Sequence, residues 1–242
     1  MATCTGRSSS RSSADARARS GGALALVAAV AIACTPAPAP PSAHDIVTKA
    51  VARTTTLRSA HFKLDVTKGY VLVGPSLRVL KAEGDVALPD RLRVRARVDV
   101  GAAIVETDLI QVAGDSFYLD PFTTRWQRLG QGLTVVPLLD PERGVANLIR
   151  SARDVRVEAR ETVDGAAGWR VRGRLRPADV TALLGGDPVA EDVAVEAVVG
   201  DDGLVRRLVL SGAIVPGEVA ETVRRLEFSG FDGAVRIEPP VP

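Results

Sequence analysis

The sequence predicts an α+β fold in which helices pack on the concave face of one strongly curved antiparallel sheet. Apolar and charged residues alternate over residues 92–100, which is the period of a strand with one dry and one wet face. Such clean alternation is typical of antiparallel sheets. Few of the predicted strands alternate strictly with helices, so a doubly wound parallel sheet is disfavoured.

Strands are predicted along most of the chain beyond residue 60. The alternation recurs in residues 61–66, 155–160 and 169–175, and further strands are expected at residues 103–112, 116–119, 193–199, 204–213 and 222–228. Gly and Asp accept the positive φ of tight turns, which predicts hairpins between the strands. The predicted turns are Pro89-Asp90, Gly114-Asp115, Asp164-Gly165, Asp201-Asp202-Gly203 and Asp232-Gly233.

Three helices accompany these strands. Ser42 is a capping residue for a first helix that reaches about residue 57. Asp140-Pro141-Glu142 combines a capping Asp, a Pro at the first helical position and an early acid, which predicts a helix from there to about residue 152. A shorter helix is expected from Pro177 to a stop at Gly185-Gly186. The predicted order is helix, several strands, helix, two strands, short helix, three strands.

The N-terminal segment, residues 1–33, has the layout of a signal peptide. A basic, Ser-rich stretch precedes the apolar run 23–33, which is about half of the ~20 residues that cross a bilayer. The run ends in Ala31-Ile32-Ala33-Cys34, which resembles the bacterial lipobox, with Ala31 where Leu is usual. The resemblance implies that Cys34 carries diacylglycerol and begins the mature chain. A plain signal peptide with an incidental cysteine is the alternative.

The mature chain is expected to be anchored to a membrane by this lipid. Residues 34–41 form a Pro-rich linker, ~20 Å long at ~3 Å per residue, and residues 42–242 form the folded domain. We therefore expect an exported protein, anchored on the extracytoplasmic face of the cell membrane. Cys4 lies in the leader, so the mature protein has no thiol pair for a disulfide or a thiolate metal site.

Composition and motifs exclude several classes of function. The chain carries 31 basic and 29 acidic residues, and the excess lies before Cys34, so the domain lacks the surplus that nucleic-acid binding requires. His44 and His61 are expected to be solvated, which leaves no candidate base for a Ser-His-Asp triad. No metal, phosphate-loop or dinucleotide motif occurs. We expect no cofactor, no metal and no nucleic-acid partner.

Charged residues on the strands favour a solvated sheet face over a site. Glu106 and Asp108 share a strand face and resemble a glycosidase pair, but such carboxylates usually belong to a wet face. Two rows of arginines are suited to anionic headgroups, and are more typical of charges that keep a sheet from aggregating. These rows are Arg91, Arg93, Arg95 and Arg97, and Arg170, Arg172, Arg174 and Arg176.

The apolar faces of the strands carry the main functional hypothesis. If the helices leave the concavity unfilled, small apolar side chains would line a dry hollow suited to acyl chains, at ~0.8 kcal/mol per buried CH₂. If the helices fill it, the same residues form an ordinary core, and the pattern leaves both open. The candidate lining residues are Phe62, Leu64, Val66, Leu92, Val94, Ala96, Val98, Val100, Val145, Leu148, Ile149, Val155, Val157, Trp169, Val171 and Leu183.

Several stretches resemble the LppX/LprA/LprF/LprG group of actinobacterial lipoproteins. The most specific is residues 138–149 around Asp140-Pro141, and the others are Asp164-Gly165 with residues 169–173, and residues 176–180. Phe117-Tyr118 with Trp126 downstream resembles the aromatic strand pair of the family. The likeness covers roughly residues 42–235. It implies a LolA/LolB-like half-barrel whose helices close over a large apolar cavity. Cys34 is the only residue of this chain to which a motif of the family assigns a role, that of the lipidated cysteine.

The resemblance also implies a function and a partner. Members of the group hold or move acylated lipids, such as triacylated glycolipids or triacylglycerol, and often work with a membrane exporter. The leading hypothesis is therefore a non-catalytic lipid carrier of the cell envelope. The alternative is a membrane-tethered scaffold that binds a protein partner and no lipid. An enzyme that acts on envelope lipid or sugar is the third hypothesis, and it would depend on carboxylates such as Glu106 and Asp108.

Overall fold

The computed structural model describes residues 40–73, 77–129, 138–140, 142, 144–184, 187–189 and 191–240, and only the backbone of residues 182–184. They all belong to the second of the chain's two compact units, Pro40–Pro242. Residues 1–39 lie outside the described residues, with the predicted signal peptide, Cys34 and most of the linker. Among the described helices, none has both the length and the apolarity that crossing a membrane requires.

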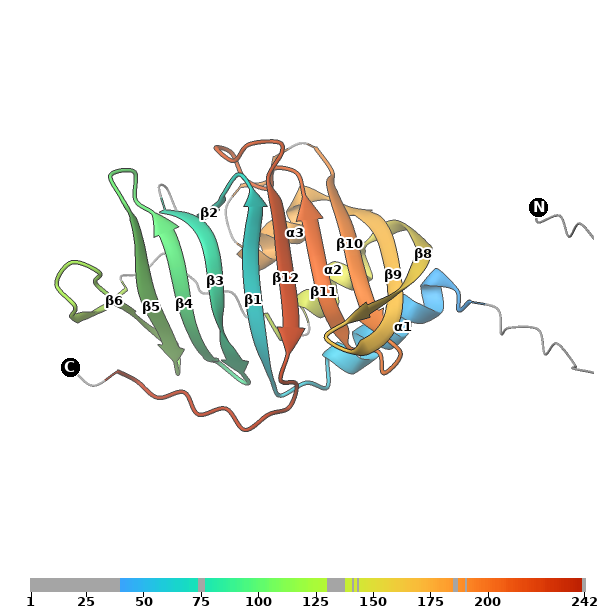
Figure 1. Ribbon diagram of the computed structural model, residues 1–242, viewed down its shortest axis with the longest axis horizontal. Helices are drawn as coiled ribbons and strands as arrows, with labels where there is room; N and C mark the ends of the chain where they lie inside the picture. The colour runs from blue at the N-terminus through green and yellow to red at the C-terminus, as the bar shows by residue number, and fades with distance from the viewer. Residues whose placement is uncertain are drawn as a thin grey trace, which may run out of the picture. The chain divides into compact units, whose positions relative to one another are not determined.

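Antiparallel strands form a single 12-stranded sheet (Figure 1). Its order is β7-β6-β5-β4-β3-β1-β12-β11-β10-β9-β8, and β2 pairs with β3. The strands are β1 (Ser59–Lys68), β2 (Val71–Val73), β3 (Leu77–Ala87), β4 (Arg91–Asp99), β5 (Ile104–Val112), β6 (Asp115–Leu119), β7 (Trp126–Arg128), β8 (Arg153–Val163), β9 (Ala166–Leu175), β10 (Val193–Gly200), β11 (Val205–Ser211) and β12 (Val223–Ser229).

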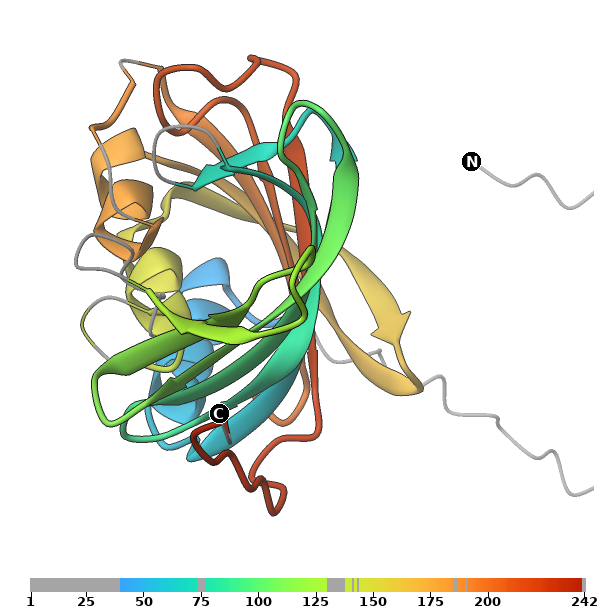
Figure 2. The ribbon, with the colours of Figure 1, turned by 90° about the vertical axis from the view of Figure 1, so that its left-hand side faces the viewer.

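The sheet is strongly curved, and its helices pack on the concave side (Figure 2). These helices are α1 (Ala43–Thr54), α2 (Val145–Ser151) and α3 (Pro177–Leu184), and α2 contacts both of the others. Their apolar side chains meet the inner face of β1 and β9 to β12 in the main core. The predicted fold class and element order are therefore confirmed.

The first helix forms as its sequence predicts, and ends earlier. The Ser42 side chain accepts a hydrogen bond from the Asp45 backbone N–H at 3.1 Å, which caps the N-terminus. Ile46, Ala50 and Thr54 are buried on one face. Leu57, predicted to lie in the helix, follows its end and is 3% exposed in the main core.

The second helix does not begin at Asp140, so that prediction is wrong. The Asp140 carboxylate accepts the Glu142 N–H at 2.8 Å, and its carbonyl accepts the Gly144 N–H at 2.7 Å, which closes a turn. The helix begins at Val145, after Gly144. A Cβ on Gly144 would lie 2.3 Å from the Leu138 carbonyl oxygen, so this tight turn requires glycine. The Asp therefore caps a turn before the helix.

Two strands, β2 and β3, were not predicted, and β7 was expected only from the family resemblance, which paired Trp126 with Phe117-Tyr118. In β3 a register shift between Val79 and Lys81 breaks the alternation of apolar and charged residues. Ala82 and Gly84 then occupy inward positions of the strand, and both are poor strand formers. Long-range pairing with β1 and β4 stabilises β3 in place of a local signal.

The predicted hairpin turns are largely in place. Asp164 and Gly165 both have positive φ, at 48° and 78°, between β8 and β9. The turn predicted at Gly114-Asp115 lies one residue earlier, at Ala113 and Gly114, with φ of 53° and 82°. Asp115 begins β6.

Candidate functional site

Part of the concave face is apolar and only half-buried. Leu64 and Val66 follow Phe62 at intervals of two along β1, so they share the inward face of that buried side chain. The half-buried apolar residues on this face of β1, β4, β5 and the part of β3 after its register shift, here called the inner strip, are Leu64, Val66, Ala82, Val94, Ala96, Val105 and Leu109. Thr107 of β5 is half-buried on the same face, opposite Ala96, and its hydroxyl donates to the Leu119 carbonyl at 2.7 Å. Water reaches these side chains in part, unlike the residues of the main core.

Strand register brings the inner strip together from distant parts of the sequence. Ala82 of β3 lies opposite both Leu64 of β1 and Ala96 of β4. Val94 of β4 lies opposite Leu109 of β5. Small side chains at the centre of the strip leave the backbone less covered than Leu or Phe would. The strip is therefore a shallow apolar surface on the inside of the bend.

The predicted lining residues, apart from Val100 and Leu183, divide into three groups. Phe62, Leu92, Val145, Leu148, Ile149 and Val171 are buried in the main core. Val155, Val157 and Trp169 are half-buried and pack against that core. Leu64, Val66, Val94 and Ala96 lie in the inner strip, with Val98 buried beside it. Whether any of them touches a ligand stays a prediction.

Two predicted lining residues need separate mention. Val100 lies beyond the end of β4 and is 42% exposed, so the strand supplies one residue fewer than the alternation predicted. The side chain of Leu183 lies outside the described residues. Conversely, Ala82, Val105 and Leu109 were not predicted as lining residues. The period-two pattern of residues 105–109 contained a signal for the last two.

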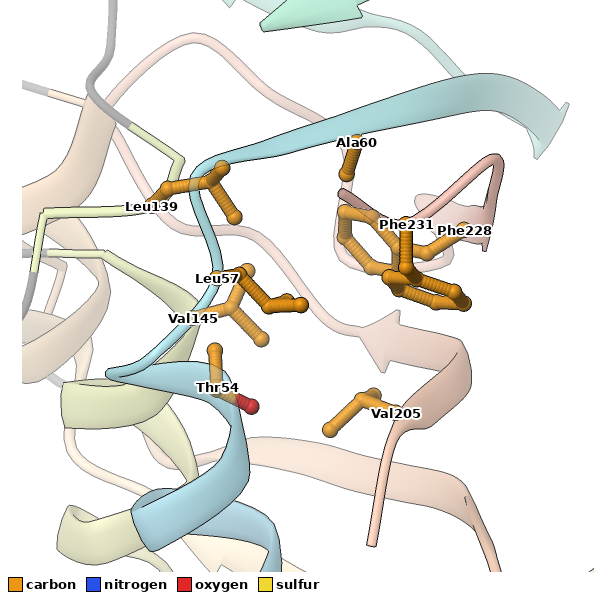
Figure 3. A pocket seen from close by; sticks show the side chains of 8 residues that line it. All are labelled: Thr54, Leu57, Ala60, Leu139, Val145, Val205, Phe228 and Phe231. Atoms are coloured by element: carbon orange, nitrogen blue, oxygen red, sulfur yellow. The ribbon is translucent and has the colours of Figure 1, made fainter. Parts of the chain in front are cut away.

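A small pocket lies in the core at the end of α1 (Figure 3). It has a volume of about 10 Å³, which is room for one water molecule and not for an acyl chain. The hydroxyl of Thr54 lines it and has no hydrogen-bond partner among the described residues. One water would satisfy that hydroxyl. Its lining residues are Thr54, Leu57, Ala60, Leu139, Val145, Val205, Phe228 and Phe231.

Polar groups lie at the β6–β7 margin of the inner strip. Tyr118 is opposite Leu109, and its hydroxyl donates to Gln127 Oε1 at 2.8 Å. Gln127 in turn donates to Asp120 at 2.9 Å. Backbone N–H groups of Thr123 and Phe122 also donate to Asp120, and hold the pKa of its carboxyl below the usual value. The strip thus has an apolar floor and one hydrogen-bonding edge.

The outer face of the sheet carries alternating charges in register. Residues directly opposite one another on β5, β4, β3, β1, β12 and β11 form the row Asp108, Arg95, Glu83, Lys63, Glu227 and Arg207. The N–O distances are 2.8 Å for Arg95–Asp108 and 3.2 Å for both Lys63–Glu83 and Arg207–Glu227. Each exposed pair adds little stability, under ~1 kcal/mol. Together they mark this side as the solvated face, except where Ile110 of β5, opposite Arg93, is buried in a cluster with Ile237.

The arginines and carboxylates singled out in the sequence belong to this outer face, except Arg176, which follows β9 and pairs with Asp179 of α3 at 2.9 Å. Asp108 is paired with Arg95, and the hydrogen bond between them raises the pKa of the guanidinium. Glu106 lies opposite Arg97 on the same face. In the second row, Arg172 Nε lies 2.8 Å from Glu196. Among the described residues, no group of His, Cys, Asp and Glu has an arrangement that could hold a metal ion.

These features define an open half-barrel with a charged outer face and a partly uncovered apolar inner face. The chain belongs to the LppX_LprAFG lipoprotein family, whose model matches residues 42–237. The lipoarabinomannan carrier protein LprG of Mycobacteroides abscessus is 25% identical over 203 residues, 83% of this chain and 85% of LprG. Lipoprotein LprA of Mycobacterium tuberculosis is 30% identical over 151 residues, 60% of this chain and 59% of LprA.

Solved structures share the fold. LprF from Mycobacterium bovis superposes with a TM-score of 0.69 at 16% identity, over 83% of this chain and 97% of LprF. LppX from Mycobacterium tuberculosis superposes with a TM-score of 0.59 at 16% identity, over 81% of this chain and 98% of LppX. The family resemblance predicted from the sequence is confirmed, and the protein is an envelope lipoprotein by family.

Proposed function

We propose that this protein binds an acylated lipid against the inner strip and carries it within the cell envelope, without catalysis. The observation that supports the proposal is an apolar, half-buried inner face in a member of a lipoprotein family. A relative with 25% identity is named a lipoarabinomannan carrier. An acylated glycolipid is therefore the leading ligand class, and triacylglycerol is the second.

The chemistry of the inner strip suits acyl chains. None of its seven side chains carries a polar atom, and the Thr107 hydroxyl among them is already bonded to the Leu119 carbonyl. A methylene chain would therefore displace water without leaving a buried side-chain polar group unpaired. Each CH₂ that leaves water contributes ~0.8 kcal/mol. The Tyr118–Gln127–Asp120 edge offers hydrogen bonds to a headgroup or glycan. The pocket at Thr54 is too small, so the strip is the surface that would take the chains.

A second candidate is a membrane-tethered domain that binds a protein partner and no lipid. The favourable observation is the close packing of α1 and α2 on the core, where the pocket holds only about one water. Native mass spectrometry separates the two candidates. The domain Pro40–Pro242 purified from an actinobacterial host should carry a solvent-extractable lipid adduct. An apoprotein that takes up neither glycolipid nor triacylglycerol would favour the scaffold.

The membrane anchor is part of the same proposal. Cys34, in the lipobox-like sequence, would carry diacylglycerol and tether the domain to the extracytoplasmic face of the membrane. Cys34→Ser should abolish incorporation of labelled palmitate and move the protein from the membrane to the soluble fraction. Cys4→Ser is the matched control and should change neither. A membrane exporter stays the predicted protein partner, and cross-linking in intact cells tests it.

A further inference from the structure

The turn between β4 and β5 is an exposed apolar tip. Its sequence, Val100-Gly101-Ala102-Ala103-Ile104, contains no polar side chain, and all five residues are exposed. Val100 is 42% and Ile104 is 52% exposed. Hairpin turns are normally polar, and a run of this length without a covering element indicates a contact surface.

Two backbone N–H groups of the tip are hydrogen-bonded within the hairpin. The Val100 N–H donates to the Ala103 carbonyl at 3.0 Å, and the Gly101 N–H donates to the Asp99 carboxylate at 2.7 Å. Gly101 has φ of +87°, which glycine tolerates. These two bonds lower the cost of taking the tip out of water, because an unpaired backbone group is costly in lipid.

Amphipathic side chains lie directly behind the tip. Arg78 of β3 is opposite Asp99, with an N–O distance of 3.7 Å, and its guanidinium lies 4.8 Å from the centre of the Tyr70 ring. The Tyr70 hydroxyl donates to the Gly217 carbonyl of the β11–β12 loop at 2.5 Å. On that loop Val219 is 41% exposed. Arg and Tyr behind apolar residues are the arrangement of a membrane interface.

These elements lie at the same end of the sheet. The β4–β5 hairpin, β2 and the β11–β12 loop are together at the top of both ribbon views (Figures 1 and 2). Val100 continues the inward positions of β4 past Val98, and Val105 begins those of β5. The apolar surface therefore runs from the tip to the inner strip without an intervening charge.

We propose that the tip, residues 100–104, inserts into a lipid surface. A protein partner is disfavoured because the tip presents neither an aromatic or Arg anchor nor a hydrogen-bonding side chain, which the strong contacts of protein interfaces use. Insertion into the interface of a lipid surface depends mainly on apolar area. The proposed lipid anchor at Cys34 would hold the domain near such a surface. The proposal holds whether or not the inner strip binds lipid.

A single-cysteine probe tests the insertion. The chain has two cysteines, Cys4 and Cys34. In the lipidated full-length protein carrying Cys4→Ser, Ala102→Cys is labelled with an environment-sensitive fluorophore. The protein is placed in phosphatidylcholine vesicles, with or without a minority of phosphatidylglycerol, that contain an acyl-chain nitroxide quencher. Asp90→Cys, exposed at the opposite end of β4, is the matched control. The parent without an added cysteine reports any labelling of Cys34.

We expect blue-shifted, quenched emission at position 102 and aqueous, unquenched emission at position 90. Val100→Ser with Ile104→Ser should lower the ratio of inserted to aqueous label at position 102 by ~10-fold or more, since burying one such side chain is worth about that factor. Circular dichroism checks that the variant is folded. Aqueous emission at position 102 on both vesicle types, or equal quenching at positions 90 and 102, overturns the proposal.

Discussion

Arg224 of β12 and Glu218 of the β11–β12 loop form a buried ion pair, with side chains 2% and 1% exposed. Arg224 also donates to the Gly212 carbonyl at 2.7 Å, and Glu218 accepts the N–H groups of Leu72 at 3.0 Å and Ile214 at 2.8 Å. Burial lowers the pKa of Arg224, and the Glu218 carboxylate opposes that shift. The pair therefore fastens the loop to β2 and β12.

Glu218→Gln should destabilise the fold by about 3 to 5 kcal/mol, because the guanidinium of Arg224 would stay buried without its counter-charge. Urea unfolding followed by circular dichroism measures the loss. Glu221→Gln, exposed on the same loop, is the control and should change stability by less than ~0.5 kcal/mol. Equal stability of Glu218→Gln and the parent would mean that the pair does not hold the loop.

Gly84→Ala should also destabilise the protein, by about 2 kcal/mol or more, because the sheet bends too closely there to admit a methyl group. A Cβ at Gly84 would lie 1.9 Å from the Arg93 carbonyl oxygen, which is backbone and cannot move aside. Gly200→Ala is the comparison and should cost less, since its methyl group would lie 2.5 Å from Asp202 Oδ1, a side-chain atom that can turn away at the cost of its hydrogen bond from the Leu204 N–H. A thermal melt in which both variants lose the same stability would contradict this explanation.

Ala96→Phe should lower lipid occupancy by ~10-fold or more while the domain stays folded. The ring would cover the centre of the inner strip, where Ala96 lies opposite Ala82, and exclude the area that an acyl chain would contact. Native mass spectrometry measures the bound fraction. Ala194→Phe makes the same change at an exposed position of β10 and should leave occupancy unchanged. Full occupancy of Ala96→Phe would place the ligand elsewhere.

Acid should lower the stability of the fold in part through Glu83, which lies on the outer face. The hydrogen bond from Lys63, joined by one from His61, lowers the pKa of Glu83 below its usual 4.5. A lowered carboxyl pKa contributes stability above the unfolded value, and that stability is lost as pH falls through the folded value. Glu83→Gln should therefore flatten the decline of stability below pH 4.5, and cost under ~1 kcal/mol at neutral pH. The midpoint of urea unfolding, measured across pH for the parent and for Glu83→Gln, tests this. Curves of midpoint against pH that run parallel below pH 4.5 would refute it.

Much of the fold was readable from local patterns. Alternation assigned the faces of β4, where Leu92, Val94, Ala96 and Val98 point inward and the arginines outward. Turn residues located the β8–β9 hairpin at Asp164, and Ser42 located the start of α1. These signals act within a few residues, so the sequence by itself determined them.

The tertiary structure decided the rest. β3 lacks a local signal, because its register shift at Val79 and its small inward residues hide the strand until β1 and β4 pair with it. The start of α2 is at Val145 and not at Asp140, because the Asp140 carboxylate and carbonyl accept the N–H groups of Glu142 and Gly144 and close a turn there. The opposition of Glu83 to Lys63 and of Ala82 to Ala96 depends on register between distant strands. Periodicity determines which face a side chain takes, and only the paired sheet determines what it meets there.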